Sequence, residues 1–164
     1  MTDQSNGAPE QVPGQIAVNA QFIKDLSFES PNVLKIMSQP SSQPPEVNFN
    51  LGVQANTVGP DLYDVTLTIR AEAKRDNMTA FLIELAYAGV FTITGIPQDQ
   101  MEPVLFIEAP RLLFPFARAI ISDLTRDGGF TPLMLNPIDF VDLYQRKLAE
   151  RRSLSDAPVN NLPN

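Results

Sequence analysis

The stretch LYDVTLTIRAEAKR, residues 62–75, alternates apolar and polar side chains along its whole length. The apolar side chains share one parity, and they are Tyr63, Val65, Leu67, Ile69, Ala71 and Ala73. Charged residues and threonines occupy the other parity. Because successive side chains of a strand point to opposite faces, this pattern predicts a long antiparallel strand with one face in the core and the other in water.

The residues that follow predict a second strand folded back on the first. Arg75-Asp76-Asn77 supplies a tight hairpin turn, although it lacks the Asn-Gly pair typical of such turns. The next run, TAFLIELAYAGVFTITG at 79–95, again keeps large apolar residues on one parity: Phe81, Ile83, Leu85, Tyr87, Phe91 and Ile93. It also carries Leu82, Ala86, Ala88 and Val90 on the opposite parity, with Glu84 among them. We therefore expect both faces of this strand to make contacts, with another layer of the fold or with a partner.

Two further extended segments precede this hairpin. EVNFNLGVQ, residues 46–54, alternates Val47, Phe49, Leu51 and Val53 with polar residues, which predicts a half-buried strand. A turn is expected at 56–61, around Gly59-Pro60. An earlier extended segment, 16–28, ends at Ser30-Pro31, and the proline-rich loop SQPSSQPPE joins it to the next strand.

The end of that first segment, KDLSFESPN at 24–32, carries two acids, Asp25 and Glu29. In an extended chain they share one face about 13 Å apart, which is too far for two carboxylates acting on one bond. In a helix the same spacing would stack two like charges. The extended reading is favoured, and from these residues alone the two acids are solvated charges that protect an edge strand from adding to other sheets.

From Pro97 onward the apolar period changes from two to about 3.6, which predicts helices. QDQMEPVLFIE, 98–108, predicts a short or irregular helix because of Pro103. In FPFARAIISDLTRDGG, 114–129, Pro115 suits the first turn of a helix and Gly128-Gly129 a C-terminal stop. Its apolar stripe is expected to be Phe116, Ala119, Ile120 and Leu124.

A last helix is expected to begin with Asn136 as N-cap and Pro137 as its first residue. Its apolar residues are Phe140, Val141, Tyr144 and Leu148, and its polar side pairs Asp142 with Arg146. Strands followed by helices predict an α+β fold, a four-stranded antiparallel sheet with C-terminal helices on one face. We expect a single domain at 16–152 between a disordered tail at 1–15 and a flexible tail at 153–164.

The composition removes most enzyme classes. The 164 residues include no cysteine and no histidine, which excludes thiol catalysis, Ser-His-Asp systems and the commonest transition-metal ligand sets. We expect no catalytic, cofactor-binding or metal-binding residues. The formal net charge of −7 argues against nucleic-acid binding. No signal peptide is evident and no apolar run approaches the ~20 residues of a membrane span, so the protein is expected to be soluble and cytoplasmic, without membrane insertion.

The chain also holds more apolar side chains, including ten phenylalanines, than a sheet under two helices has to bury. This surplus points to association. Dimerisation of identical copies and a groove for an extended apolar peptide both remain open on this evidence. A small-molecule-binding protein and a structural adaptor for one folded partner are further classes that the residues leave open.

Five blocks resemble the SecB family of export chaperones in their order and spacing. They are KDLSFESPN (24–32), PEVNFNL (45–51), DLYDVTLTIRAEA (61–73), TAFLIELAYAGVFTITGI (79–96) and RLLFPFARAIISDLTRDGGFTPLMLNPIDF (111–140). The resemblance covers about residues 20–150. It implies a cytosolic, ATP-independent holdase, without cofactor, that binds unfolded precursors of secreted proteins and passes them to the SecA motor of the translocase. It also implies a homotetramer built as a dimer of dimers, with the helices between two sheets.

The resemblance also implies roles for particular positions. The SecA-docking residues are Asp25, Glu29, Leu82 and Glu84, and the parity of the 79–95 strand places the latter two on its less apolar face. The dimer-dimer interface residues are Ile83, Leu85 and Tyr87. The client-binding groove residues are Val47, Phe49, Leu51, Phe140 and Tyr144.

Overall fold

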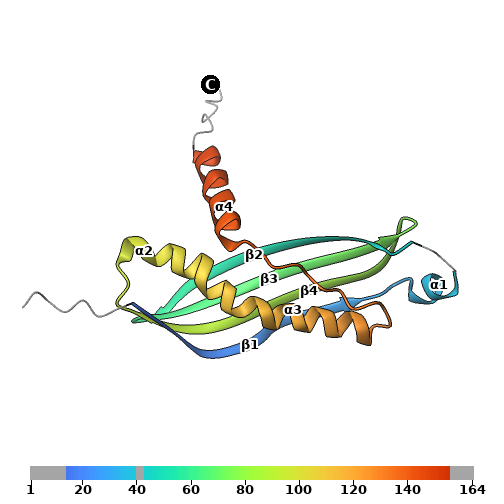
Figure 1. The fold of residues 1–164 in the computed structure, drawn as a ribbon, viewed down its shortest axis with the longest axis horizontal. Helices are drawn as coiled ribbons and strands as arrows, with labels where there is room; N and C mark the ends of the chain where they lie inside the picture. Colours follow the sequence, from blue (N-terminus) through green and yellow to red (C-terminus); the bar gives the residue numbers. More distant parts are fainter. Residues whose placement is uncertain (1–13, 40–42, 156–164) are drawn as a thin grey trace, which may run out of the picture.

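A four-stranded antiparallel sheet forms the centre of the molecule, in the order β1-β4-β3-β2. The computed structural model describes residues 14–39 and 43–155 (Figure 1). The strands are β1 (Gln15–Glu29), β2 (Glu46–Gly59), β3 (Leu62–Arg75) and β4 (Met78–Thr94). The hairpin of β3 and β4 lies in the middle of the sheet, and β1 and β2 form the two edges.

The hairpin turns use left-handed backbone at residues that tolerate it. Asp76 and Asn77 have φ angles of 51° and 60°, so the predicted turn between β3 and β4 is confirmed. The turn between β2 and β3 is tighter than the predicted 56–61. Residues 56 and 57 still pair with β3, β2 continues to Gly59, and Asp61 takes a φ of 54°.

A short helix, α1 (Val33–Ser38), follows β1 and was not predicted. Its Ile36 is buried, and the guanidinium of Arg75, from the turn end of β3, donates to the carbonyl oxygens of Ile36 and Gln39. This helix is therefore held by contacts with residues about forty positions away, which local sequence patterns do not show.

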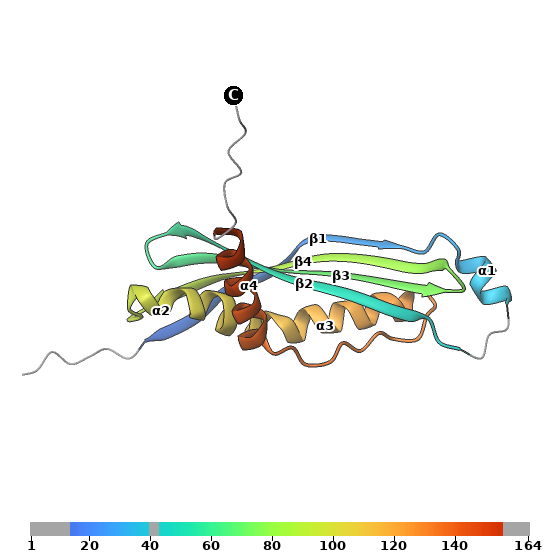
Figure 2. The same cartoon turned by 90° about the horizontal axis from the view of Figure 1, so that it is seen from above.

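The helical region begins with α2 (Gln98–Pro103), continues through a π-helical turn, η1 (Val104–Glu108), and leads into α3 (Ala109–Asp127). The irregular 98–108 helix is thus confirmed. Helix α3 lies lengthwise against one face of the sheet (Figures 1 and 2). It begins earlier than predicted, so Pro115 is inside the helix and not in its first turn. The Gly128-Gly129 stop is confirmed, with Gly129 at a φ of 85°.

The row of α3 that faces the sheet differs from the predicted stripe. The buried residues of α3 are Ala109, Pro110, Leu113, Phe114, Ala117, Ile121 and Thr125. Of the predicted stripe, Phe116 is 51% exposed and Ala119 is also exposed, whereas Ile120 and Leu124 are half-buried against the core. Both rows are apolar, and the 3.6-residue period alone cannot decide which of them meets the sheet.

The last helix, α4 (Phe140–Ser155), is reached through an extended segment at 130–139. Its N-cap is Asp139, whose Oδ1 accepts hydrogen bonds from the N–H groups of Val141 (3.0 Å) and Asp142 (3.1 Å). The predicted start at Asn136-Pro137 is therefore wrong. Residues 136 and 137 belong instead to the extended segment, in which Leu135 is buried in the core. The predicted Asp142–Arg146 ion pair is present.

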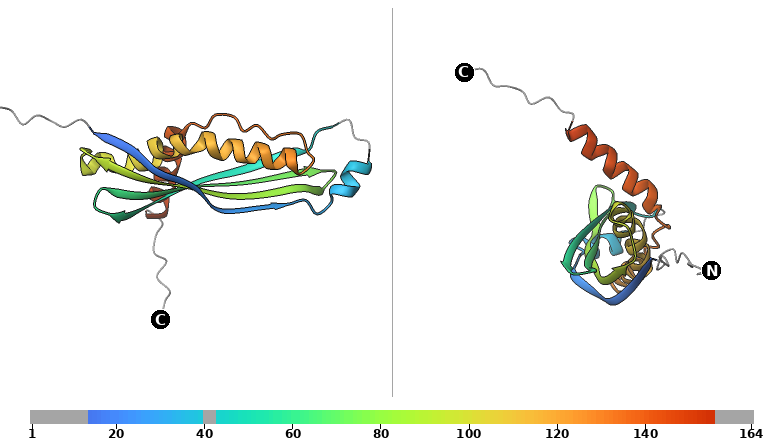
Figure 3. Two further views of the ribbon diagram at one scale, coloured as in Figure 1. Left: turned by 90° about the horizontal axis from the view of Figure 1, so that it is seen from below. Right: turned by 90° about the vertical axis from the view of Figure 1, so that its left-hand side faces the viewer.

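Helix α4 runs past the β2 edge and points away from the sheet and α3 (Figure 3). It ends three residues beyond the predicted domain boundary at 152, and β1 begins at Gln15, within the predicted tail. The predictions for residues 1–13 and 156–164 lie outside the described residues. Within the ranges 14–39 and 43–155, the helices lack the length and apolar character needed to cross a membrane.

Candidate functional site

On the face of the sheet opposite α3, the described helices leave β1 and β4 uncovered, and α4 projects past the β2 edge (Figure 2). Asp25, Ser27 and Glu29 of β1 pair with Ala86, Glu84 and Leu82 of β4 and share this face. Directly paired side chains have Cβ atoms roughly 5 Å apart. The four residues implied in SecA docking are thus brought together on two neighbouring strands.

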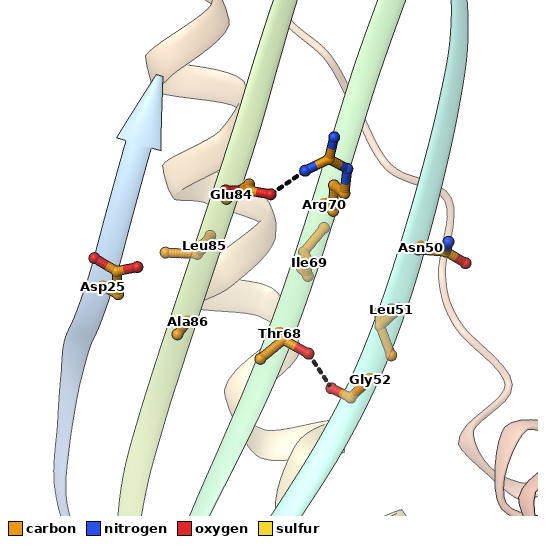
Figure 4. Close-up of a pocket in the computed structure, with 10 residues that line it drawn as sticks. All are labelled: Asp25, Asn50, Leu51, Gly52, Thr68, Ile69, Arg70, Glu84, Leu85 and Ala86. Atoms are coloured by element: carbon orange, nitrogen blue, oxygen red, sulfur yellow. Dashed lines mark hydrogen bonds and ion pairs between the residues drawn. The ribbon is translucent and has the colours of Figure 1, made fainter. Parts of the chain in front are cut away.

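Strand β3 adds two charged residues that sequence reasoning did not select. Arg70 pairs in register with Glu84, and its guanidinium donates to the Glu84 carboxylate (Figure 4). Glu72 pairs in register with Leu82, and its Oε1 lies 3.2 Å from Nζ of Lys74. We call Asp25, Glu29, Arg70, Glu72, Leu82 and Glu84 the acidic face. The polar parity of residues 62–75 was the signal for Arg70 and Glu72, but it did not show which neighbours they would meet.

A shallow hollow of about 470 Å³ lies beside these charges. Its floor is made by small side chains, since Gly52, Thr68 and Ala86 occupy three neighbouring strands (Figure 4). The Arg70–Glu84 ion pair and Asp25 border it. A Cβ atom at Gly52 would lie 2.8 Å from Oγ1 of Thr68, so this position favours glycine. The result is an open, nearly flat surface with charged side chains at its rim.

Farther along the same face, some of the apolar side chains that β4 carries on this side are covered. Ala88 and Thr66 are buried, and Phe22 of β1 lies in register beside Ala88. The expectation that both faces of β4 make contacts therefore holds for Ala88, while the end of β4 that carries Leu82 and Glu84 is open to a partner.

The three residues implied in the dimer-dimer interface lie on the opposite, helix-covered face. Ile83, Leu85 and Tyr87 are all buried within their own chain, and the Tyr87 ring stacks on Phe116 of α3 at 6.3 Å between centroids. The Tyr87 hydroxyl donates to Oε1 of Gln21 (3.3 Å). Helix α3 thus covers the three side chains within their own chain. Their assignment to the dimer-dimer interface stays a prediction.

The residues implied in client binding divide among several places along β2. Phe49 and Leu51 line a hollow of about 370 Å³ with Ile138 and Leu143. Val47 instead lines an apolar hollow of about 550 Å³ near α1, with Phe81, Phe130 and Leu133 among its walls. Phe140 is 1% exposed and packs edge-on against Phe114, so its assignment to a groove is wrong.

Tyr144 lines a third hollow, of about 480 Å³, between α4, η1 and β2. It stacks on Phe106 at 6.2 Å between centroids, and burial together with Glu102 raises the pKa of its phenol. Nζ of Lys147 donates to the backbone oxygen of Val53 (3.0 Å) and lies 4.3 Å from the centroid of the Phe106 ring. Burial lowers the pKa of Lys147, and Arg151 lowers it further. These contacts, which sequence patterns did not reveal, fasten α4 to the β2 edge.

The described residues contain no cluster of three carboxylates that could hold a metal ion. Comparison with known proteins identifies the family. A family model described as "SecB: Preprotein translocase subunit SecB" matches residues 9–151. The chain belongs to the SecB family. The resemblance seen in the five sequence blocks is thereby confirmed.

SecB proteins from several bacteria are similar to this chain over most of its length. The protein-export protein SecB of Rhodopseudomonas palustris (strain TIE-1) is 49% identical over 148 residues, covering 90% of this chain and 94% of that protein. The SecB of Bartonella bacilliformis is 52% identical over 145 residues, covering 88% of this chain and 89% of that protein. The SecB of Maricaulis maris is 44% identical over 165 residues, covering 98% of this chain and 95% of that protein.

A solved SecB-like structure shares the fold. The SecB-like chaperone of Mycobacterium tuberculosis, in complex with a ChAD peptide from an antitoxin, superposes with a TM-score of 0.63. It covers 75% of this chain and 90% of that chain at 12% sequence identity. At this identity the similarity supports the SecB fold and nothing about individual side chains.

Proposed function

We propose that this SecB-family chain is an ATP-independent holdase of the cytoplasm. It binds precursors of secreted proteins while they are unfolded, keeps them competent for translocation and delivers them to the SecA motor of the Sec translocase. The observation that carries this proposal is the match to the SecB family over residues 9–151. The hollows along β2 support it, because they lie along one edge strand and apolar side chains such as Val47, Phe49 and Leu51 line them, as an extended apolar segment requires.

Client binding uses the β2 edge and the hollows beside it. Val47, Phe49 and Leu51 project to the same side of an edge strand, next to hollows that α4, α1 and the 130–139 segment complete. An extended client segment lies along this edge with alternate apolar side chains in the hollows. Tyr144 extends the site at the α4 end. Binding of this kind recognises exposed apolar chain, which folded proteins do not present.

The mechanism is mass action on the unfolded client. Because the holdase binds the unfolded state and not the folded one, it lowers the concentration of free unfolded chain and slows folding. Selectivity follows from how fast a client would otherwise bury its apolar segments. No nucleotide and no catalytic residue takes part, so the protein is not an enzyme.

SecA docks on the acidic face. Asp25, Glu29 and Glu84 supply carboxylates around Leu82, and the open sheet surface leaves them accessible. A surface with this charge pattern suits a basic partner segment with an apolar contact at its centre. Because this face and the β2 edge are formed by different residues, SecA and client bind the chain at separate places.

The working assembly is a homotetramer, a dimer of dimers. Helix α3 presents an exposed apolar row that includes Leu112 and Phe116, and such a row on a single chain indicates an interface. We place this row between the two sheets of the assembly. The interface depends indirectly on Ile83, Leu85 and Tyr87, because α3 packs on these three side chains and they set its position.

The proposal is tested by diluting a slow-folding secretory precursor from denaturant into the purified protein without nucleotide. We expect suppressed light scattering and slower refolding at about one assembly per client, with no binding of the folded client. The control is the same client diluted into buffer that contains an unrelated acidic protein. Absence of an effect on several such clients would contradict the holdase and favour an adaptor or ligand-binding protein.

A further inference from the structure

Arg70 is the one arginine of the acidic face. It forms an ion pair with Glu84, whose carboxylate is also needed for docking. Its guanidinium donates to Glu84, and the side chains of the two residues are 52% and 49% exposed. Glu84 is also a residue implied in SecA docking. The incoming basic segment and Arg70 therefore require the same acceptor.

The other carboxylates of the acidic face differ in whether they have an ion-pair partner. Among the described residues Asp25 and Glu29 have no ion-pair partner, whereas Glu72 is paired with Lys74. The face thus combines two open carboxylates on β1 with an occupied one at its centre on β4. A basic partner meets the open pair freely, but at Glu84 it meets a positive charge that is already there.

We propose that Arg70 is an internal competitor for the basic docking segment of SecA. On docking, a cationic group of the partner replaces Arg70 at Glu84. This inference rests on the proposed docking function of the acidic face and adds a residue that sets its strength. Arg70 keeps docking weak enough to be reversible, which a carrier that returns for new clients needs.

The physical basis is the small stability of an exposed ion pair. Because both side chains are about half-exposed, water replaces much of what the pair gains, and breaking it costs little. The released guanidinium remains anchored to the central strand β3, where it repels the incoming cation. Removal of Arg70 therefore eliminates both the cost of breaking the pair and the repulsion.

The test compares Arg70→Gln with Arg126→Gln in the full-length assembly. Arg126 is a matched control, since it also pairs with carboxylates, Asp123 and Asp127, but lies on α3, on the other side of the sheet from the acidic face. With purified SecA at low and moderate salt, we expect R70Q to bind about three- to tenfold more tightly than the wild type. R126Q is expected to stay within about twofold of the wild type. Arg70→Lys keeps the charge and is expected to stay close to the wild type.

A double-mutant cycle with Glu84→Gln separates competition at Glu84 from a general change in charge. If the partner replaces Arg70 at Glu84, the gain caused by R70Q is smaller in the E84Q background, because no ion pair remains to be broken. An equal gain in both backgrounds, or R70Q binding no better than R126Q, overturns the inference alone. Failure of the wild type to bind SecA overturns the docking proposal and the inference with it.

Discussion

Leu82 and Leu85 are three residues apart on β4, yet they belong to different environments. Leu85 is 2% exposed beneath α3, whereas Leu82 is half-buried on the acidic face, with Glu29 and Glu72 as its cross-strand neighbours. The chemistry of the two side chains is the same. The difference shows that the covering helix, and not hydrophobicity, decides which face of the strand stabilises the fold and which one is free for a partner.

The largest expected effect is on stability and uses these two leucines directly. Leu85→Ala removes packed atoms from beneath α3 and is expected to lower the free energy of unfolding by about 2–5 kcal/mol. Leu82→Ala is expected to cost about 1 kcal/mol or less, because the side chain is partly in water already. Urea unfolding at a fixed protein concentration measures both. Equal losses would mean that the acidic face is packed against something in the native assembly.

A second, intermediate effect concerns the outer row of α3. Phe116→Glu places a charge on the row that we assign to contact between dimers, and we expect the mass measured by light scattering to fall from tetramer to dimer. Leu154→Glu is the matched control, since Leu154 is also an exposed apolar residue on a helix but lies near the end of α4. Its mass should be unchanged. A tetrameric F116E variant with preserved fold would place the interface elsewhere.

The smallest expected effect is on docking alone. The double variant Asp25→Asn, Glu29→Gln is expected to weaken SecA binding about tenfold, equivalent to about 1.4 kcal/mol, while client holding stays the same. Asp61→Asn combined with Asp99→Asn makes the same change in net charge away from the acidic face and serves as the control. If the D25N/E29Q variant loses client holding as well, the two binding surfaces are not separate.

The sequence by itself determined the central hairpin and the strand parities. Alternation with a period of two is a local property, so the face shared by Leu82 and Glu84, and the opposite face shared by Ile83 and Leu85, followed directly from residues 62–94. The spacing of Asp25 and Glu29 likewise placed both acids on one side of β1. These predictions needed no knowledge of distant residues, and the register of the sheet agrees with them.

The tertiary structure decided what local patterns leave open. Two apolar rows run along α3, and packing against the sheet selected the row of Leu113 over that of Phe116. The same long-range packing buried Phe140 against Phe114, moved the N-cap of α4 to Asp139, and placed Arg70 against Glu84. Each of these outcomes depends on which distant side chain arrives as a neighbour. That information lies in the three-dimensional packing of the chain and not in the period of any one segment.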